Sequence, residues 1–149
     1  MKIYFDVCCL NRPFDNQEQE RIRLESEAIL FIMARFENKQ WQWISSEVVL
    51  DEILQTRNEE RRRRLLSLNE KASESLVVSD VDFARAKELT QWGFDDMDSL
   101  HLACAESGTA DLFLTTDDKL IRTANGLAGR INVLVDNPLN WLFDQRMDA

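Results

Sequence analysis

The sequence predicts a three-layer α/β/α fold built around a mainly parallel sheet of four to five strands. Short apolar segments alternate with longer segments of helical periodicity along the whole chain, the pattern that parallel sheets require. The 149 residues include only four Gly and two Pro, so long flexible linkers are not expected. Hydrophobic residues make up 44% and charged residues 30%, an ordinary globular composition. We therefore expect one domain spanning residues 1–149.

The first half of the chain supplies two expected strands and three expected helices. Apolar residues at 2–7 and 41–45 predict the strands, and a loop marked by Pro13 covers 11–16. A wide apolar stripe predicts a helix over 17–37. Ser46 is the expected N-cap of a helix that runs to about residue 54, and a further helix is expected over 58–72.

The second half repeats the alternation. Strands are expected at 76–79, 111–116 and 131–135, with Asn137-Pro138 ending the last one. Asp80 is the expected cap of a helix over 81–91, and Asp98 opens a helix over 99–107 that Gly108 ends. Asp117 begins the turn into a helix that runs to about residue 125.

Charge and motif content exclude several classes of protein. No stretch approaches the roughly 20 apolar residues that span a bilayer, and the N-terminus reaches Asp6 too soon for a signal peptide, so we expect a cytoplasmic protein. Three cysteines, two of them adjacent, do not form a disulfide framework. A single His and the lack of a P-loop disfavour histidine-based metal hydrolysis and P-loop phosphate binding. The net charge of −9 argues against strong nonspecific binding to nucleic acid, but a carboxylate-based nuclease remains compatible with it.

Four acidic residues are placed to meet at one edge of the predicted sheet. Asp6 ends the first strand and Asp117 follows the fourth, while Asp98 opens a helix and Glu52 lies about one and a half turns into the helix after the second strand. Functional groups of parallel sheets gather at the carboxyl ends of the strands. Converging carboxylates repel one another and take up protons or a cation, and their hard oxygens favour Mg²⁺ or Mn²⁺. Four acids near strand ends are weak evidence by themselves, because the chain has 27 acidic residues.

At these positions the sequence resembles the PIN domain family, which includes the toxin ribonucleases of toxin–antitoxin pairs. The similarity begins with the apolar strand that ends in Asp6 and continues with Ser46-Glu-Val-Val-Leu-Asp-Glu52. It is strongest from Asp98 to Asp117, where an Asp opens a helix, a Gly-x-x-Asp turn follows, and an apolar strand ends in Thr-x-Asp or a close equivalent. The resemblance covers nearly the whole chain, although each motif is loose.

This resemblance implies a Mg²⁺- or Mn²⁺-dependent ribonuclease acting on RNA, with a small antitoxin protein as partner and frequent homodimerisation. Carried over by position, Asp6, Glu52, Asp98 and Asp117 are the metal ligands and catalytic residues. The weaker candidates for hydrogen bonding to the ligands or contact with substrate are Asn11, Arg12, Thr115 and Thr116. The segment Val7-Cys8-Cys9 lacks the small hydroxyl residue that often follows the first Asp of the family. That departure, with the acidic charge, supports an alternative: a catalytically degenerate PIN-like module that binds proteins.

Several positions compete for the same roles. Glu47 also follows the second strand, but at 100° per residue it points in a clearly different direction from Glu52. The remaining competitors are Asp95 and Asp96 for Asp98, and Asp118 for Asp117. His101, one turn after Asp98, is expected to be a partly buried helical residue, and the arginines at 57 and 61–64 are expected to form a solvated helix face.

Overall fold

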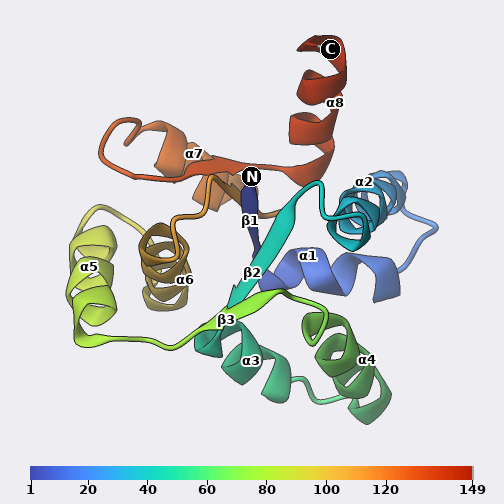
Figure 1. The fold of residues 1–149 in the computed structure, drawn as a ribbon, viewed down its shortest axis with the longest axis horizontal. Helices are drawn as coiled ribbons and strands as arrows, with labels where there is room; N and C mark the ends of the chain where they lie inside the picture. Colours follow the sequence, from blue (N-terminus) through green and yellow to red (C-terminus); the bar gives the residue numbers. More distant parts are fainter. Residues whose placement is uncertain (149) are drawn as a thin grey trace.

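A five-stranded, entirely parallel sheet forms the centre of the computed structural model, which describes residues 1–148 and the side chains of residues 1–145 (Figure 1). The strand order is β3-β2-β1-β4-β5. The strands are β1 (Lys2–Phe5), β2 (Gln42–Ser46), β3 (Glu74–Leu76), β4 (Leu112–Leu114) and β5 (Leu134–Asp136). The central strand β1 pairs with β2 on one side and β4 on the other, with Tyr4 opposite Ile44 and Phe113. The predicted parallel sheet is therefore confirmed.

Helices cover both faces of this sheet and complete a three-layer α/β/α fold. They are α1 (Val7–Asn11), the 3₁₀ helix η1 (Arg12–Phe14), α2 (Glu20–Glu37), α3 (Glu47–Leu54), α4 (Glu59–Asn69), α5 (Asp80–Gln91), α6 (Asp96–Ser107), α7 (Asp118–Asn125) and α8 (Pro138–Asp148). Helices α1, α2 and α8 lie on one side of the sheet, and α5 and α6 lie on the other (Figure 1). Helices α2 and α8, far apart in the sequence, pack against each other.

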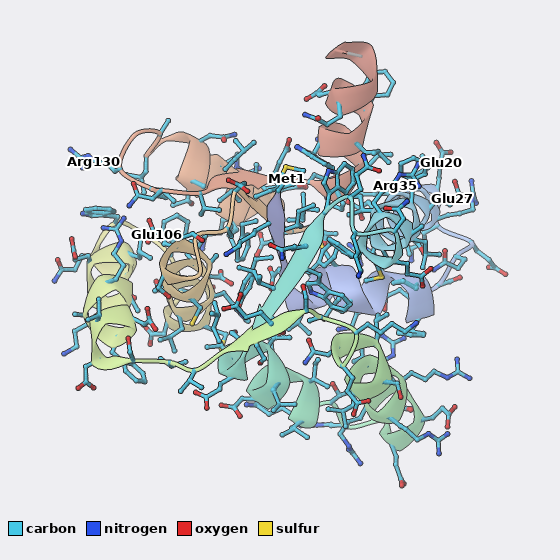
Figure 2. All side chains as sticks on the ribbon, in the orientation of Figure 1. Met1, Glu20, Glu27, Arg35, Glu106 and Arg130 are labelled. Atoms are coloured by element: carbon cyan, nitrogen blue, oxygen red, sulfur yellow. The ribbon has the colours of Figure 1, made fainter. Side chains whose placement is uncertain are left out.

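The core lies between these layers and is richest around the two middle strands. All residues of β4 are buried, as are Ile3, Tyr4 and Phe5 of β1, which matches the continuous apolar runs expected of a parallel sheet covered on both faces. Phe5 packs edge-on against Trp43, at 5.7 Å between ring centroids. The charged residues Glu20 and Glu27 instead point outward from α2 into solvent (Figure 2).

Polar caps fix where the helices after the strands begin. The Ser46 hydroxyl accepts a hydrogen bond from the backbone N–H of Val49, as predicted for the N-cap of α3. The prediction that Asp80 caps α5 is wrong, because Ser79 does so in a reciprocal capping box with Asp82. Asp80 is instead the first residue of the helix.

Other predicted boundaries also need correction. The segment 7–14, expected to extend the first strand and then form a loop, contains α1 and η1, because buried Val7, Cys9 and Leu10 anchor α1 against the core. The edge strands β3 and β5 lie two or three residues from their expected starts, and each has only one neighbour to set its register. Helix α2 begins three residues later than expected, α6 begins three residues earlier, and α8 was not predicted.

Within residues 1–148, no helix combines the length and the apolar character that crossing a bilayer requires.

Candidate metal centre

Asp6 stands at the carboxyl end of the central strand and is held from three directions. Its backbone N–H donates to the carbonyl of Leu114 at 2.9 Å, which continues the pairing of β1 with β4. Its carboxylate Oδ1 accepts from the N–H of Val7 at 2.8 Å, and Oδ2 accepts from the Thr115 hydroxyl at 2.8 Å. Asp6 is 7% exposed. The adjacent ends of β1 and β4 therefore fix this carboxylate, with Thr115 as a hydrogen-bond donor to it.

Glu52 and His101 join Asp6 from two different helices. Glu52 lies on α3 and His101 on α6, and the His101 Nε2 and Glu52 Oε1 atoms are 3.0 Å apart. One ligand atom from each of Asp6, Glu52 and His101 lies within 4.8 Å of the other two. The sequence predicted that Asp6 and Glu52 would meet, but it assigned His101 no place in the site. The i, i+3 spacing from Asp98 was the signal that put His101 near this end of α6.

A series of hydrogen bonds between buried side chains leads from the core of the protein to the cluster of Asp6, Glu52 and His101. The Tyr4 hydroxyl is 2.6 Å from the Ser46 Oγ and 2.8 Å from the His101 Nδ1. Tyr4, Ser46 and His101 are each 0% exposed, whereas the Glu52 side chain is 32% exposed. This series of hydrogen bonds therefore connects the interior of the protein to the partly exposed carboxylate of Glu52.

Asp98 and Asp117 line a small hollow together with Asp95 and Lys119. Asp98 lies in the first turn of α6, not before it, and Asp117 is the N-cap of α7. Both capping bonds of Asp117, from the N–H groups of Lys119 and Leu120, are accepted by its Oδ1 atom. The four predicted acids thus occupy one region in two groups, Asp6 with Glu52 and Asp98 with Asp117.

The carboxylates of the two groups interact electrostatically. Burial, followed by the negative charges of Asp6, Asp117 and Asp95, raises the pKa of Asp98 to about 7. Burial is also the main reason that the pKa of Asp6 is raised, and the Glu52 charge adds to it, although His101 and the Thr115 hydrogen bond oppose the change. Both carboxyls therefore hold their protons more tightly than isolated aspartic acids, as expected where negative charges converge.

The competing acids have other partners. The Glu47 Oε2 accepts a hydrogen bond at 2.9 Å from the backbone N–H of Val78, which ties α3 to the chain beyond β3. Asp118 forms a bidentate pair with Arg21, at 2.8 and 2.9 Å, and this hydrogen bonding lowers its pKa. Asp96 accepts a long, 3.5 Å bond from Thr90. These contacts favour Glu52 over Glu47 and Asp117 over Asp118. They favour Asp98 over Asp96, whereas Asp95 lines the same hollow as Asp98 and Asp117.

The weaker candidates are placed less favourably. Asn11 donates to the carbonyl of Val7 and accepts from Arg61, so it supports the backbone after Asp6 without contacting the carboxylates in any described bond. Arg12 donates to Glu25 at 2.9 Å and to Asp15 at 3.0 Å. Any contact of Arg12 with substrate has to compete with these two acids. Thr116 is buried, and its backbone N–H lies 3.3 Å from the Cys8 sulfur.

The arginine-rich helix α4 is only in part the solvated face that the sequence predicted. Arg63 and Arg64 are exposed and pair with Glu60 on the same helix. Arg61 instead reaches back to the segment after α1, where it donates to Asp15 at 2.7 Å and to the carbonyl of Phe14 at 2.7 Å. Arg61 therefore has a structural task in holding this segment in place.

The donor set fits a hard divalent cation. Carboxylate oxygens are the preferred ligands of Mg²⁺ and Mn²⁺. Burial and neighbouring negative charges raise the pKa of Asp6 and of Asp98, and a positive charge nearby would favour the ionised form of each. No Lys or Arg pairs with Asp6, Glu52, Asp98 or Asp117 among the ion pairs of the described side chains. A cation supplied from solution would relieve the repulsion.

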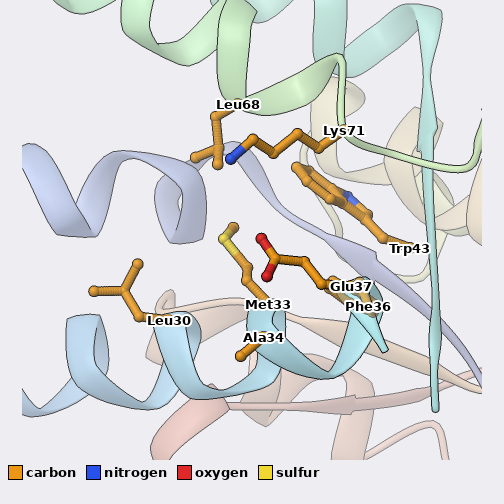
Figure 3. Close-up of a pocket in the computed structure, with 8 residues that line it drawn as sticks. All are labelled: Leu30, Met33, Ala34, Phe36, Glu37, Trp43, Leu68 and Lys71. Atoms are coloured by element: carbon orange, nitrogen blue, oxygen red, sulfur yellow. The ribbon is translucent and has the colours of Figure 1, made fainter. Parts of the chain in front are cut away.

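A larger hollow lies elsewhere, between α2, β2 and α4, and has a volume of about 520 Å³. Its lining is mostly apolar and includes Leu30, Met33, Trp43 and Leu68, and the charged side chains of Glu37 and Lys71 also contribute to it (Figure 3). None of the four candidate acids contributes to it. The acidic centre is therefore a shallow cluster at the edge of the sheet and not a deep cavity.

Comparison with known proteins supports the fold. No model of a known protein family matches the chain, and no curated protein sequence does either. Among solved structures, VapBC2 from Rickettsia felis, described as bound to a DNA fragment from its promoter, is 17% identical with a TM-score of 0.59, and the match covers 92% of this chain and 98% of that one. FitAcB from Neisseria gonorrhoeae is 14% identical with a TM-score of 0.60, over 91% and 97% of the two chains. VapBC-1 from nontypeable Haemophilus influenzae is 12% identical with a TM-score of 0.59, over 93% and 98%.

These matches extend over nearly the full length of each structure, so the likeness concerns the whole fold and not a fragment. Together with the strand order and layers, they establish a three-layer, PIN-like α/β/α architecture. Sequence identities of 12–17% show the fold alone. What the chain does must be argued from its site.

Proposed function

We propose that this protein is a divalent-metal-dependent endoribonuclease, the toxin of a toxin–antitoxin pair. One observation carries the proposal: acidic side chains at the end of β1, on α3, on α6 and at the start of α7 lie in one region at the carboxyl edge of a PIN-like sheet. Such a cluster, which forms no ion pair with Lys or Arg among the described side chains, suits the binding of Mg²⁺ or Mn²⁺. The sequence resemblance to the PIN family supports the same activity.

In this proposal Asp6, Glu52, Asp98 and Asp117 hold the metal. A bound divalent ion would supply charge to neutralise a phosphodiester and would acidify a water. Thr115 keeps Asp6 in place through its 2.8 Å hydrogen bond. Asp98, whose pKa is raised to about 7 by burial and its acidic neighbours, can hold or release a proton near neutral pH. That property suits a group that must exchange a proton for a metal ion.

The proposed partners are an RNA substrate, a small antitoxin protein and a second copy of the chain. The likeness to VapBC and FitAcB structures supports the antitoxin, as does the PIN resemblance of the sequence. The net charge of −9 makes a basic antitoxin surface plausible on electrostatic grounds. Exposed apolar side chains such as Leu30, Leu54 and Phe83 supply helix faces that suit a protein interface. A cytoplasmic location follows from the proposed RNA substrate.

The test is cleavage of single-stranded RNA by the purified protein, with Mn²⁺ or with EDTA. We expect cleavage only with metal, and a loss of at least about 100-fold in rate for Asp6→Asn and Asp98→Asn, because each removes a charged ligand. Asp51→Asn, on the exposed face of α3, is the control for loss of one negative charge. Full activity of Asp6→Asn would remove this residue from the mechanism.

Two further outcomes would redirect the proposal. Cleavage of flap DNA in preference to single-stranded RNA would indicate a structure-specific DNA nuclease. A folded wild-type protein that binds no divalent ion would favour the second candidate, a degenerate PIN-like module whose role is to bind a partner protein. The apolar hollow between α2 and α4 is the observation that favours this second candidate.

A further inference from the structure

The single histidine of the chain is fully buried, and both of its ring nitrogens have partners. His101 Nε2 lies 3.0 Å from the Glu52 Oε1, and Nδ1 lies 2.8 Å from the Tyr4 hydroxyl. One ring nitrogen of His101 also belongs, with a carboxylate oxygen each of Asp6 and Glu52, to a group of ligand atoms within 4.8 Å of one another. By position alone, His101 is thus either a metal ligand or a group that holds a ligand in place.

The hydrogen-bond partners decide between these two roles. A carboxylate only accepts hydrogen bonds, so the 3.0 Å contact with Glu52 assigns the proton to His101 Nε2. A nitrogen that carries a proton has no lone pair for a metal. In the neutral ring Nδ1 is then the acceptor, and the Tyr4 hydroxyl must be its donor.

The hydrogen bonds of Ser46 and Tyr4 are consistent with this assignment of donors and acceptors. Ser46 Oγ already accepts from the backbone N–H of Val49 at 3.3 Å, which leaves its own hydroxyl proton to donate to Tyr4 at 2.6 Å. Burial raises the pKa of Tyr4 well above its usual value, so the phenol keeps the proton that it donates to His101. Every donor in the chain from Ser46 to Glu52 thereby meets an acceptor.

We propose that His101 is a positioning residue: its Nε2–H donates to Glu52 and fixes this carboxylate in the acidic cluster, while Tyr4 and Ser46 fix the tautomer. The part of the proposal that concerns the metal rests on the proposed function of the cluster. The tautomer and its hydrogen bond to Glu52 are properties of the metal-free protein. Glu52 needs such support, because its side chain is one-third exposed and comes from α3, whereas Asp6 follows β1.

The first experiment reads the tautomer directly. With ¹⁵N-labelled histidine, the protein gives one set of imidazole signals, since it contains one histidine. Long-range ¹H–¹⁵N spectra are expected to show a protonated Nε2 and an unprotonated Nδ1, both without metal and with Mg²⁺. A proton on Nδ1, or loss of the Nε2 proton on addition of Mg²⁺, would overturn the proposal, the latter in favour of His101 as a ligand.

The second experiment separates positioning from general structural support. His101→Gln keeps an amide donor near the Nε2 position, whereas His101→Asn keeps one near Nδ1 and loses the contact with Glu52. We expect Mn²⁺ affinity, measured by calorimetry, to fall about 10- to 100-fold in the Asn variant and to be largely retained in the Gln variant, as for other groups that orient metal ligands. Tyr4→Phe removes the donor to Nδ1 and should produce a mixture of tautomers.

The outcomes distinguish this proposal from the function on which it builds. Equal Mn²⁺ affinities for folded Gln and Asn variants would overturn the positioning role even if the wild type binds metal tightly. A wild type that binds no Mn²⁺ would overturn the metal function and the metal-related part of this proposal. The imidazole spectra would still decide whether His101 donates to Glu52, even if neither variant folds.

Discussion

Replacement of Asp98 by Asn should stabilise the metal-free protein at alkaline pH. Burial, then the charges of Asp6, Asp117 and Asp95, raises the pKa of Asp98 to about 7, so the folded state disfavours the ionised carboxyl. From about pH 4, where the unfolded chain releases this proton, to about pH 7, where the folded chain does, the stability of the folded state therefore falls as pH rises. Asparagine has nearly the same shape and carries no charge at any pH in this range.

The magnitude follows from the pKa. A rise in pKa from about 4 in the unfolded chain to about 7 in the folded protein corresponds to about 4 kcal/mol of unfolding free energy for a fully buried group. Asp98 is only partly buried, and screening by solvent reduces the effect, so we expect about 1–2 kcal/mol. The gain in unfolding free energy of Asp98→Asn over the wild type should therefore grow by this amount between about pH 4 and about pH 8.

The assay is urea denaturation at both pH values with EDTA present, with Asp51→Asn as the control for a change in net charge. Excess Mn²⁺ should reverse the order, because at about 100 times the dissociation constant a bound ion stabilises the wild type by about 2.7 kcal/mol and the variant hardly at all. A difference between the two proteins that is the same at both pH values, or an Asp98→Asn variant that becomes relatively less stable at alkaline pH, would refute the reasoning from charge repulsion.

Three further predictions concern the support of the site and the fold. Thr115→Val removes the 2.8 Å hydrogen bond to Asp6 and should weaken Mn²⁺ binding about 10-fold in calorimetry, with a wild-type affinity counting against the role. Glu25→Gln removes the charge of a carboxylate that is 1% exposed and pairs with Arg12 and Arg21. We expect the unfolding free energy, measured by urea denaturation, to fall by about 3 kcal/mol and the Mn²⁺ affinity to stay unchanged. Gly108→Ala places a Cβ 2.5 Å from a methyl group of Leu76 and 3.0 Å from a methyl group of the buried Ile44, and should cost about 1–3 kcal/mol. Gly126→Ala, with its nearest atom at 3.5 Å, should be nearly neutral.

The main features of the fold were accessible from the sequence because they depend on local patterns. Runs of apolar residues predicted β1, β2 and β4. Because strands that alternate with helices pair in parallel, the same pattern placed Asp6 and Asp117 at one edge of the sheet. Ser46 was recognisable as a cap because its hydroxyl bonds within the next turn. In contrast, α8 went unpredicted, although Asn137 followed by Pro138 is a sequence typical of a helix start.

The contacts that complete the site depend on tertiary packing and could not be predicted in this way. The contact between His101 and Glu52 exists because α6 packs against α3, a pairing that no local pattern encodes. Likewise, the sequence placed Arg12 beside the site but did not reveal that Glu25, on α2, binds its guanidinium. Residues separated by 13 to 49 positions meet here, and only the folded chain shows which charges are already paired.

The most direct test of the central claim is a Mn²⁺ titration by calorimetry on the wild type and on the double variant Asp98→Asn, Asp117→Asn. These two residues line one hollow beside Asp6 and Glu52, so their joint replacement removes half of the acidic cluster. We expect saturable Mn²⁺ binding in the wild type and none in a folded double variant. Binding of equal strength in both proteins, or no binding in a folded wild type, would contradict the claim that these acids form a metal centre.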